Sequence, residues 1–198
     1  MDNSFNSHLF KQVIIGTKSK SRRSLFQKLN LNFQYQNANI DEQKVRNLQN
    51  NKFDALKIAT AKAKQLSLKN KNKIIVTFDT TILFKRKTIY KCDTQKSCRV
   101  LLNEFNDRSH DLYTGMIFML NNKILKKHLT ETKVIFKNNN QLDITKYVRK
   151  NFNQIKHAVG SYNIEGDGKS FFENIDNSYF NVLGVDIINF IKILKKTS

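Results

Sequence analysis

The chain has 198 residues, of which 39% are hydrophobic and 26% are charged, with two cysteines and no proline or tryptophan. This length suffices for one domain with a buried core, and no apolar run is long enough to span a bilayer. Two cysteines are too few for a disulfide framework, and their spacing matches no zinc site. We expect one cytoplasmic domain over residues 1–198, with no secretory signal in the first 12 residues and no membrane partner.

The net charge of +19 at pH 7 is the strongest signal in the composition. A cationic surplus of this size can bind nucleic acid non-specifically. The sequence is also visibly rich in lysine, asparagine, isoleucine and phenylalanine, a bias expected of AT-rich coding DNA. We favour compositional drift, because the lysines are spread along the chain, and we keep non-specific nucleic-acid binding as the alternative.

The first unit, Val13–Phe26, is organised as strand, loop and helix. Three β-favouring residues end at a glycine, a loop rich in hydroxyls and cations contains Thr17 and Ser19, and a helix is predicted over Arg22–Leu29. Loop amides and a helix N-terminus bind anions, and Arg22 suits bidentate phosphate contact. The unit predicts a polyphosphate site, with a basic helix start in a lysine-rich chain as the alternative.

The later segments alternate between strand-like and helix-like patterns. We predict strands or extended segments over 33–40, 74–78, 82–84, 88–90, 112–120 and 123–136, and helices over 53–68, 94–105, 142–151, 170–175 and 185–194. A glycine-rich loop and strand are expected over 159–168. This alternation predicts an α/β fold with a mixed sheet. In the helix over 53–68 we expect a core-facing stripe of Phe53, Leu56, Ala59, Ala63 and Leu66.

Polar residues between these elements suggest chemistry. Asp79 directly follows the apolar strand 74–78, where a carboxylate can hold Mg²⁺, activate water or simply cap a turn. Glu165 lies among glycines, which let a backbone approach a ligand closely. With Glu42 these carboxylates can hold a divalent ion, while Lys62 and Lys91 can bind anions. Such a set is suited to metal-assisted attack on a phosphoanhydride.

These residues resemble the Maf family of nucleoside triphosphate pyrophosphatases. The family opens with S-x-S-P-x-R-R-x-x-L-L after a strand, and this chain has a similar GTKSKSRRSLF over Gly16–Phe26. Further motifs follow in the family's order from about residue 13 to residue 194: Asp41-Glu42, Ile58–Ala63, Asp79-Thr80, Tyr90-Lys91-Cys92, Thr114-Gly115, Val159–Gly166 and Tyr179–Val185.

The resemblance implies hydrolysis of a nucleoside triphosphate to the monophosphate and pyrophosphate with Mg²⁺ or Mn²⁺. It implies an elongated mixed sheet flanked by helices, in two lobes with a central cleft, as in inosine-triphosphatase-like proteins. It assigns Asp79 as the proton acceptor. The other implied roles are substrate binding by Thr17, Ser19, Arg22, Lys62 and Lys91, and metal binding by Glu42, Asp79 and Glu165.

The chain departs from the family pattern at its prolines, where Lys20, Cys92 and Asp186 stand instead. The proline-free composition accounts for these changes without loss of function. Glu165 is the variant of the branch resembling 7-methyl-GTP pyrophosphatases, whereas the thymidine/uridine branch usually has glutamine, so base specificity stays open. A non-catalytic protein on the same fold, binding nucleic acid or regulating cell division, is the alternative function, and a homodimer is compatible with either.

Overall fold

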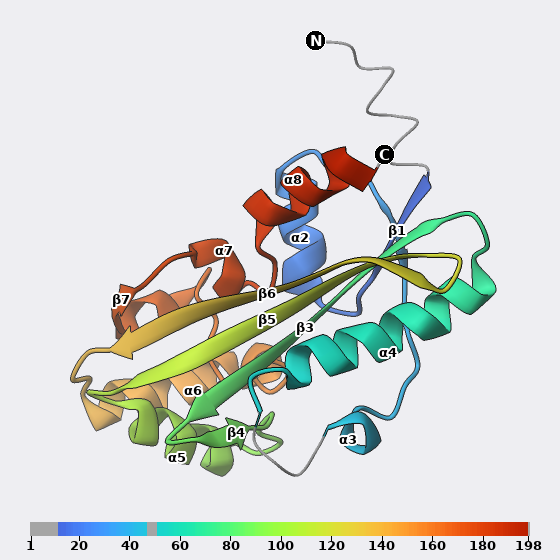
Figure 1. Ribbon diagram of the computed structural model, residues 1–198. Coiled ribbons are helices and arrows are strands. Elements are labelled where there is room, and N and C mark those ends of the chain that lie inside the picture. Colours follow the sequence, from blue (N-terminus) through green and yellow to red (C-terminus); the bar gives the residue numbers. More distant parts are fainter. Residues whose placement is uncertain (1–11, 47–50, 198) are drawn as a thin grey trace.

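The computed structural model describes residues 12–46 and 51–197. The expected absence of a secretory signal therefore concerns residues that lie almost wholly outside the described ones. A seven-stranded mixed sheet runs through the molecule in the order β2-β1-β3-β5-β6-β7, with β4 paired to β3 (Figure 1). Its strands are β1 (Val13–Gly16), β2 (Gln34–Gln36), β3 (Ile74–Phe84), β4 (Lys87–Ile89), β5 (Ser109–Leu120), β6 (Lys123–Phe136) and β7 (Phe172–Ile175).

Helices flank this sheet, which confirms the predicted α/β class and the elongated mixed sheet. Within the described ranges, every helix is too short or too polar to cross a bilayer. The helices are α2 (Lys20–Lys28), α3 (Glu42–Val45), α4 (Asp54–Lys69), α5 (Gln95–Phe105), α6 (Gln141–Ile155), the 3₁₀ helix η1 (Asp167–Phe171), α7 (Tyr179–Val182) and α8 (Ile187–Thr197).

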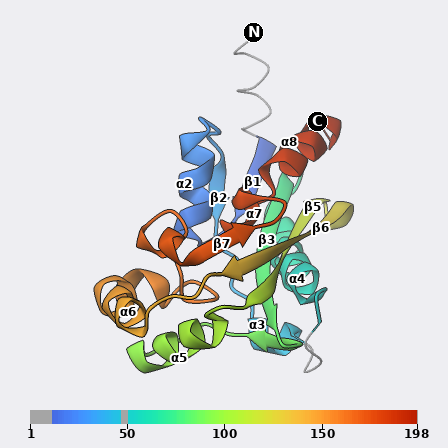
Figure 2. The same ribbon diagram turned by 90° about the vertical axis from the view of Figure 1, so that its left-hand side faces the viewer.

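Side-chain alternation along β3 separates the core into clusters. Val76 and Phe78 pack with α2 and α8, while Ile82 and Phe84 pack with α5 and α6 farther along the strand. Because these residues are spaced by two, they point to the same face of the sheet. Ile75 points to the opposite face and packs with α4. Figures 1 and 2 show α2 and α8 at one end of the sheet and α5 and α6 at the other, which supports the two predicted lobes.

Several elements follow directly from local sequence. Helix α5 begins after Thr94, whose side chain accepts from the Ser97 N–H in a capping box. The β3–β4 hairpin turns at Lys85 and Arg86, and the β5–β6 hairpin turns at Asn121 and Asn122. All four of these turn residues have positive φ between 46° and 62°, as two-residue hairpin turns require.

In other segments, pairing between strands that are distant in the sequence gives a structure that differs from the predicted one. The strand predicted to end at residue 78 continues to Phe84, because β5 pairs with β3 from Ile74 to Leu83. The helix predicted over 170–175 is wrong, since Phe172–Ile175 form β7 against the end of β6. The extended segment over 33–40 shrinks to β2, and the described residues 159–168 contain loop and helical turn without a strand.

Helix α4 also faces the core differently from the predicted stripe. Phe53 lies before the helix and is 47% exposed, whereas Ala55 and Ile58 are fully buried. Ala59, Ala63 and Leu66 are buried as predicted. The short helices α3 and α7 were not foreseen; Asp41 caps α3 by accepting from two backbone N–H groups. Helix α6 extends beyond the predicted residues 142–151 at both ends. Helix α8 begins later and ends later than the predicted residues 185–194.

Strand β6 has an open outer edge along its first residues. It pairs with β5 from Lys123 to Ile135, but in the described part of the chain it pairs with β7 only over Val134–Phe136. Residues 123–127 of this strand are exposed, and they include Lys123, Lys126 and Lys127. The sheet therefore ends in an accessible strand edge that carries lysines.

Candidate active site

The candidate site lies beside a gap along one edge of β3. Parallel strand β1 pairs with β3 only as far as Gly16 opposite Thr77, and β4 begins to pair at Ile82. The four residues 78–81 have no strand neighbour on that side among the described residues. At this gap, side chains from both faces of the sheet can reach the same space. Crevices beyond the ends of parallel strands are where α/β sheets bind ligands.

Lys62 joins two carboxylates here. Its Nζ lies 2.7 Å from Asp79 Oδ1 and 2.8 Å from Glu42 Oε1. The side chains of Lys62 and Asp79 are 15% and 8% exposed, while that of Glu42 is 39% exposed. The cluster thus has a buried end at Asp79 and an open end at Glu42.

Close packing of α4 on the sheet places Lys62 at this position. Thr77 Oγ1, on the same face of β3 as Asp79, donates a hydrogen bond of 2.7 Å to the Ala59 carbonyl. At Gly115, the β5 residue paired with Asp79, an added Cβ would lie 2.6 Å from the Ala55 and Leu56 backbone. Only glycine permits this approach of helix to strand, which explains the Thr114-Gly115 motif physically.

The environment shifts the two carboxyl pKa values in opposite directions. Burial raises the pKa of Asp79, although Lys62 and Arg22 act against this. Burial also tends to raise the pKa of Glu42, but the positive charges of Lys62, Lys91 and Arg46 outweigh burial, so this pKa is lowered. Two carboxyl groups with divergent pKa values suit different roles, one as a proton acceptor and one as a permanent anion.

Arg22 enters the gap from the first turn of α2. Its Nε donates to the Gly184 carbonyl at 2.8 Å, and its Nη2 donates to Thr80 Oγ1 at 2.9 Å. Burial lowers its pKa, with the charges of Asp79 and Glu42 acting in the opposite direction. Thr80 in turn contacts Thr114 Oγ1 at 3.2 Å. The guanidinium is therefore held beside Asp79 by two fixed partners, the Gly184 carbonyl and Thr80 of β3.

The loop between β1 and α2 has the form of an anion-binding turn. Thr17 Oγ1 accepts from the Ser19 N–H at 3.1 Å, and Ser19 caps α2 by accepting from the Arg22 N–H. Arg23 fixes the loop from outside, because its Nη2 donates to the Thr17 carbonyl at 2.7 Å. Its guanidinium also lies over the Tyr35 ring, 5.1 Å from the centroid. The second arginine of the pair thus holds the loop while Arg22 faces the gap.

The remaining sequence candidates lie differently. Lys91 is exposed, and its charge contributes to lowering the Glu42 pKa, so it belongs to the open end of the cluster. Glu165 instead forms a 2.7 Å ion pair with Lys28 at the far end of α2. Sequence reasoning missed Arg46, the C-cap residue of α3, whose Nη2 lies 3.8 Å from Glu42 Oε2 as an i, i+4 partner. That spacing is visible in the sequence once a helix is expected there.

The cluster offers oxygen ligands for a divalent ion. Asp79 Oδ2 is buried without a hydrogen-bond partner, and Glu42 shares Lys62 with it. Mg²⁺ is commonly held by one or two carboxylates together with substrate phosphates and water, so this donor pair fits. Among the described residues, no three acidic, histidine or cysteine side chains form a metal cluster. Glu165 therefore does not complete a protein-only site in this structure.

Comparison with known proteins places these residues in a wider context. A family model described as "Maf-like protein" matches residues 12–197. A dTTP/UTP pyrophosphatase of Clostridium botulinum (strain Okra / Type B1) is 29% identical over 182 residues, covering 89% of this chain and 92% of the relative. A nucleoside triphosphate pyrophosphatase of Ruegeria sp. (strain TM1040) is 24% identical over 187 residues, covering 92% and 94%.

A solved structure of a HAM1 protein from Coxiella burnetii is also similar, at 12% identity and a TM-score of 0.40, covering 64% of this chain and 73% of that one. This similarity is weak, so the description of the fold rests on the strand order and packing given above.

Proposed function

The chain belongs to the Maf-like protein family, and on this premise we propose that it hydrolyses nucleoside triphosphates to the monophosphate and pyrophosphate. The observation that carries the proposal is the Asp79–Lys62–Glu42 cluster, which lies beside Arg22 at the β3 gap. It combines a buried carboxylate with cations that can hold phosphates. The names of the relatives support the same reaction, which breaks a phosphoanhydride bond.

In the proposed mechanism, Asp79 accepts the proton of the attacking water through Oδ2, the oxygen without a partner. A raised pKa makes its carboxylate a better base than an ordinary aspartate. Lys62 holds Oδ1 and orients the carboxylate before substrate arrives. Oδ1 is thus committed to Lys62, and Oδ2 is the oxygen available both to the attacking water and to a divalent ion.

Cations and loop amides bind the triphosphate. Arg22 is fixed by Gly184 and Thr80 and presents its charge at the gap, while Lys62 and exposed Lys91 stand on the α4 side. The loop carrying Thr17 and Ser19 offers backbone N–H groups near the start of α2. Fixed donors of this kind stabilise charge that develops in the transition state.

We further propose that Asp79 and Glu42 hold Mg²⁺ or Mn²⁺ together with the substrate phosphates. When bound, such an ion neutralises charge on the phosphates. Glu165 is paired with Lys28 in this structure, and we therefore leave it out of the proposed ion site.

The test is incubation of the purified protein with a panel that includes dTTP, UTP and 7-methyl-GTP, with Mg²⁺ or Mn²⁺, and measurement of pyrophosphate. Release from at least one triphosphate is expected, and the panel also decides the base preference. No release from any nucleotide by folded protein contradicts the proposal. Binding of generic DNA without hydrolysis would favour the non-catalytic alternative.

A further inference from the structure

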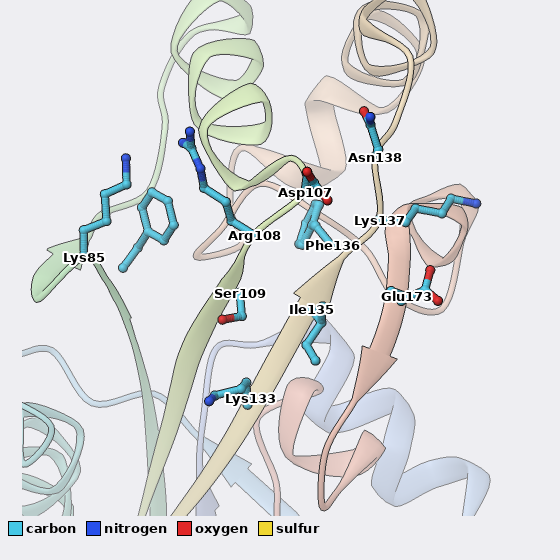
Figure 3. Close-up of a pocket in the computed structure, with 11 residues that line it drawn as sticks. Lys85, Asp107, Arg108, Ser109, Lys133, Ile135, Phe136, Lys137, Asn138 and Glu173 are labelled. Atoms are coloured by element: carbon cyan, nitrogen blue, oxygen red, sulfur yellow. The ribbon is translucent and has the colours of Figure 1, made fainter.

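A concave and cationic region lies at the C-terminal end of β3. It is a pocket of about 750 Å³ formed where the β3–β4 turn, the start of β5, the end of β6 and β7 meet (Figure 3). Phe84 lies five residues beyond Asp79 along β3, roughly 16 Å away at the usual strand rise. The pocket is therefore separate from the proposed active site. Its cations are Lys85, Arg108, Lys133 and Lys137.

The pocket floor lies on the sheet face away from the α5–α6 lobe. Val134 and Phe136 of β6 point into that lobe and are buried, so Lys133 and Ile135 between them point to the opposite face. Ser109 pairs with Ile135 and shares this face. Figure 3 shows Lys85 and Arg108 on one side of the floor and Lys137 on the other. Cations from separate elements thus line one pocket.

These cations have no carboxylate partner within ion-pair distance in the described residues. The Arg108 guanidinium donates to the Glu104 carbonyl at 3.1 Å, and the Lys85 ammonium lies 5.1 Å from the centre of the Phe84 ring. Two carboxylates, Asp107 and Glu173, also line the pocket. Asp111 lies opposite Lys133 on the β5–β6 ladder and interacts with its charge, so the four cations are offset only in part. The lining therefore keeps a positive excess with unused donors.

The chemistry of the lining favours phosphate groups. An arginine and three lysines combine a planar donor fork with compact charges, and both types bind phosphate. The volume falls within the range of small-molecule sites. The aromatic residues of the lining, Phe84 and Phe136, are only 5% and 2% exposed, so they offer no platform on which nucleic-acid bases could stack. A small ligand fits these features better than a single-stranded nucleic acid.

We propose that this pocket is a second anion site, which binds a small compound carrying several phosphate groups. Inorganic triphosphate and the phosphate tail of a nucleotide share this chemistry. The site does not depend on the proposed hydrolytic activity, because none of its residues belongs to the Asp79 cluster.

The test uses inorganic triphosphate and compares three single variants by calorimetry and by backbone-amide NMR. Lys133→Glu changes the pocket, Lys127→Glu is the matched control on the exposed part of β6, and Arg22→Ala weakens the active site. In the wild-type protein, inorganic triphosphate is expected to shift the backbone-amide NMR signals of Ser109 and Asn138. Lys133→Glu is expected to weaken this response about tenfold or more, as loss of a charge-assisted contact implies. Lys127→Glu and Arg22→Ala are expected to retain it.

A second pocket variant, Lys137→Glu, keeps the test decisive if Lys133→Glu unfolds. A non-hydrolysable nucleoside triphosphate in a parallel arm shows whether the nucleoside adds affinity; tighter or equal binding at the same amides supports the proposal. Absence of amide shifts at the pocket, or equal weakening by Lys127→Glu, overturns it. Preferential binding of a single-stranded oligonucleotide at these amides also overturns it, in favour of a nucleic-acid interface.

Discussion

Replacing Asp79 by asparagine is the sharpest test of the proposed chemistry. The two side chains have nearly the same shape, and the asparagine oxygen can still accept from Lys62, which lies 2.7 Å from Asp79 Oδ1. Lys62 also keeps Glu42 as a partner at 2.8 Å. The substitution therefore removes the proton acceptor while leaving the phosphate-binding cations in place.

The expected loss of turnover is at least about 100-fold, the lower range for a missing general base. This corresponds to about 2.7 kcal/mol of transition-state free energy. Stability is expected to move differently. Because burial raises the folded pKa of Asp79 above its value of 3.8, the ionised carboxylate lowers stability as pH rises from the unfolded towards the folded pKa. An uncharged asparagine avoids this loss, so the variant should be at least as stable as wild type at pH 7.

Turnover is measured by pyrophosphate release, nucleotide affinity by calorimetry and the free energy of unfolding by urea titration. Asp54→Asn is the matched control, because Asp54 is also buried and forms an ion pair with a lysine of α4, at 3.2 Å from Lys57 Nζ. It should lose stability with little change in turnover. Near-normal turnover of Asp79→Asn would refute the assigned role. Loss of nucleotide binding together with turnover would show that Asp79 positions the site rather than accepting a proton.

Three further predictions concern residues around the site and in the core. Gly184→Ala should raise KM and cost about 1 kcal/mol of stability, because φ is +87° and the new Cβ would lie 2.8 Å from Arg22 Nε; Gly160→Ala, at φ +88°, should cost stability alone. Burial lowers the His110 pKa from 6.5 to about 3, so the free energy of unfolding should fall by about 1.4 kcal/mol per unit as pH drops through this interval; denaturation of His110→Phe across this range should lack that slope. The Asp186 pKa is lowered, because burial is outweighed by hydrogen bonds from Asn189, Thr130 and His128. The ionised Asp186 carboxylate therefore stabilises the fold above the unfolded pKa, and this stabilisation is lost as pH falls through the folded pKa. Asp186→Asn should lower the free energy of unfolding at pH 7 by about 1 kcal/mol. At acid pH the two proteins should have the same free energy of unfolding.

Local signals predicted the elements whose geometry depends on neighbouring residues. Helix α5 and the turns at 85–86 and 121–122 are of this kind. Asp79 was expected at a strand end because the apolar run stops there. Its central position in β3 depends on ten residue pairs with β5, from Ile74 to Leu83, which no local pattern encodes. The same applies to β7, whose strand geometry depends on β6.

The candidate site divides in a similar way. The sequence indicated Asp79, Glu42 and Lys62 as site residues. In the structure Lys62 forms ion pairs with both carboxylates, because α4 packs against β5 at Gly115. The sequence also grouped Glu165 with the metal ligands, whereas the structure pairs this residue with Lys28.

Asp186 is one of three residues that stand at family prolines, and the proline-free composition accounts for the change. The structure gives it a structural part, since it is 6% exposed and its side chain accepts from the Asn189 N–H in the first turn of α8. Replacement of a proline by a helix-capping carboxylate preserves the helix start by different means.

The open edge of β6 gives the lysine-rich composition a protective effect. Unpaired strand edges invite pairing with other chains, and a protein rich in isoleucine, phenylalanine and asparagine is exposed to that risk. Lys123, Lys126 and Lys127 occupy the outer stretch of this strand, where like charges repel a second copy of the same edge. We expect their collective replacement by threonine to leave the fold intact and to promote intermolecular β-sheet, visible as concentration-dependent light scattering. Because this chain has no prolines that could interrupt the edges of its sheet, the positive charge on β6 is what prevents pairing between folded molecules.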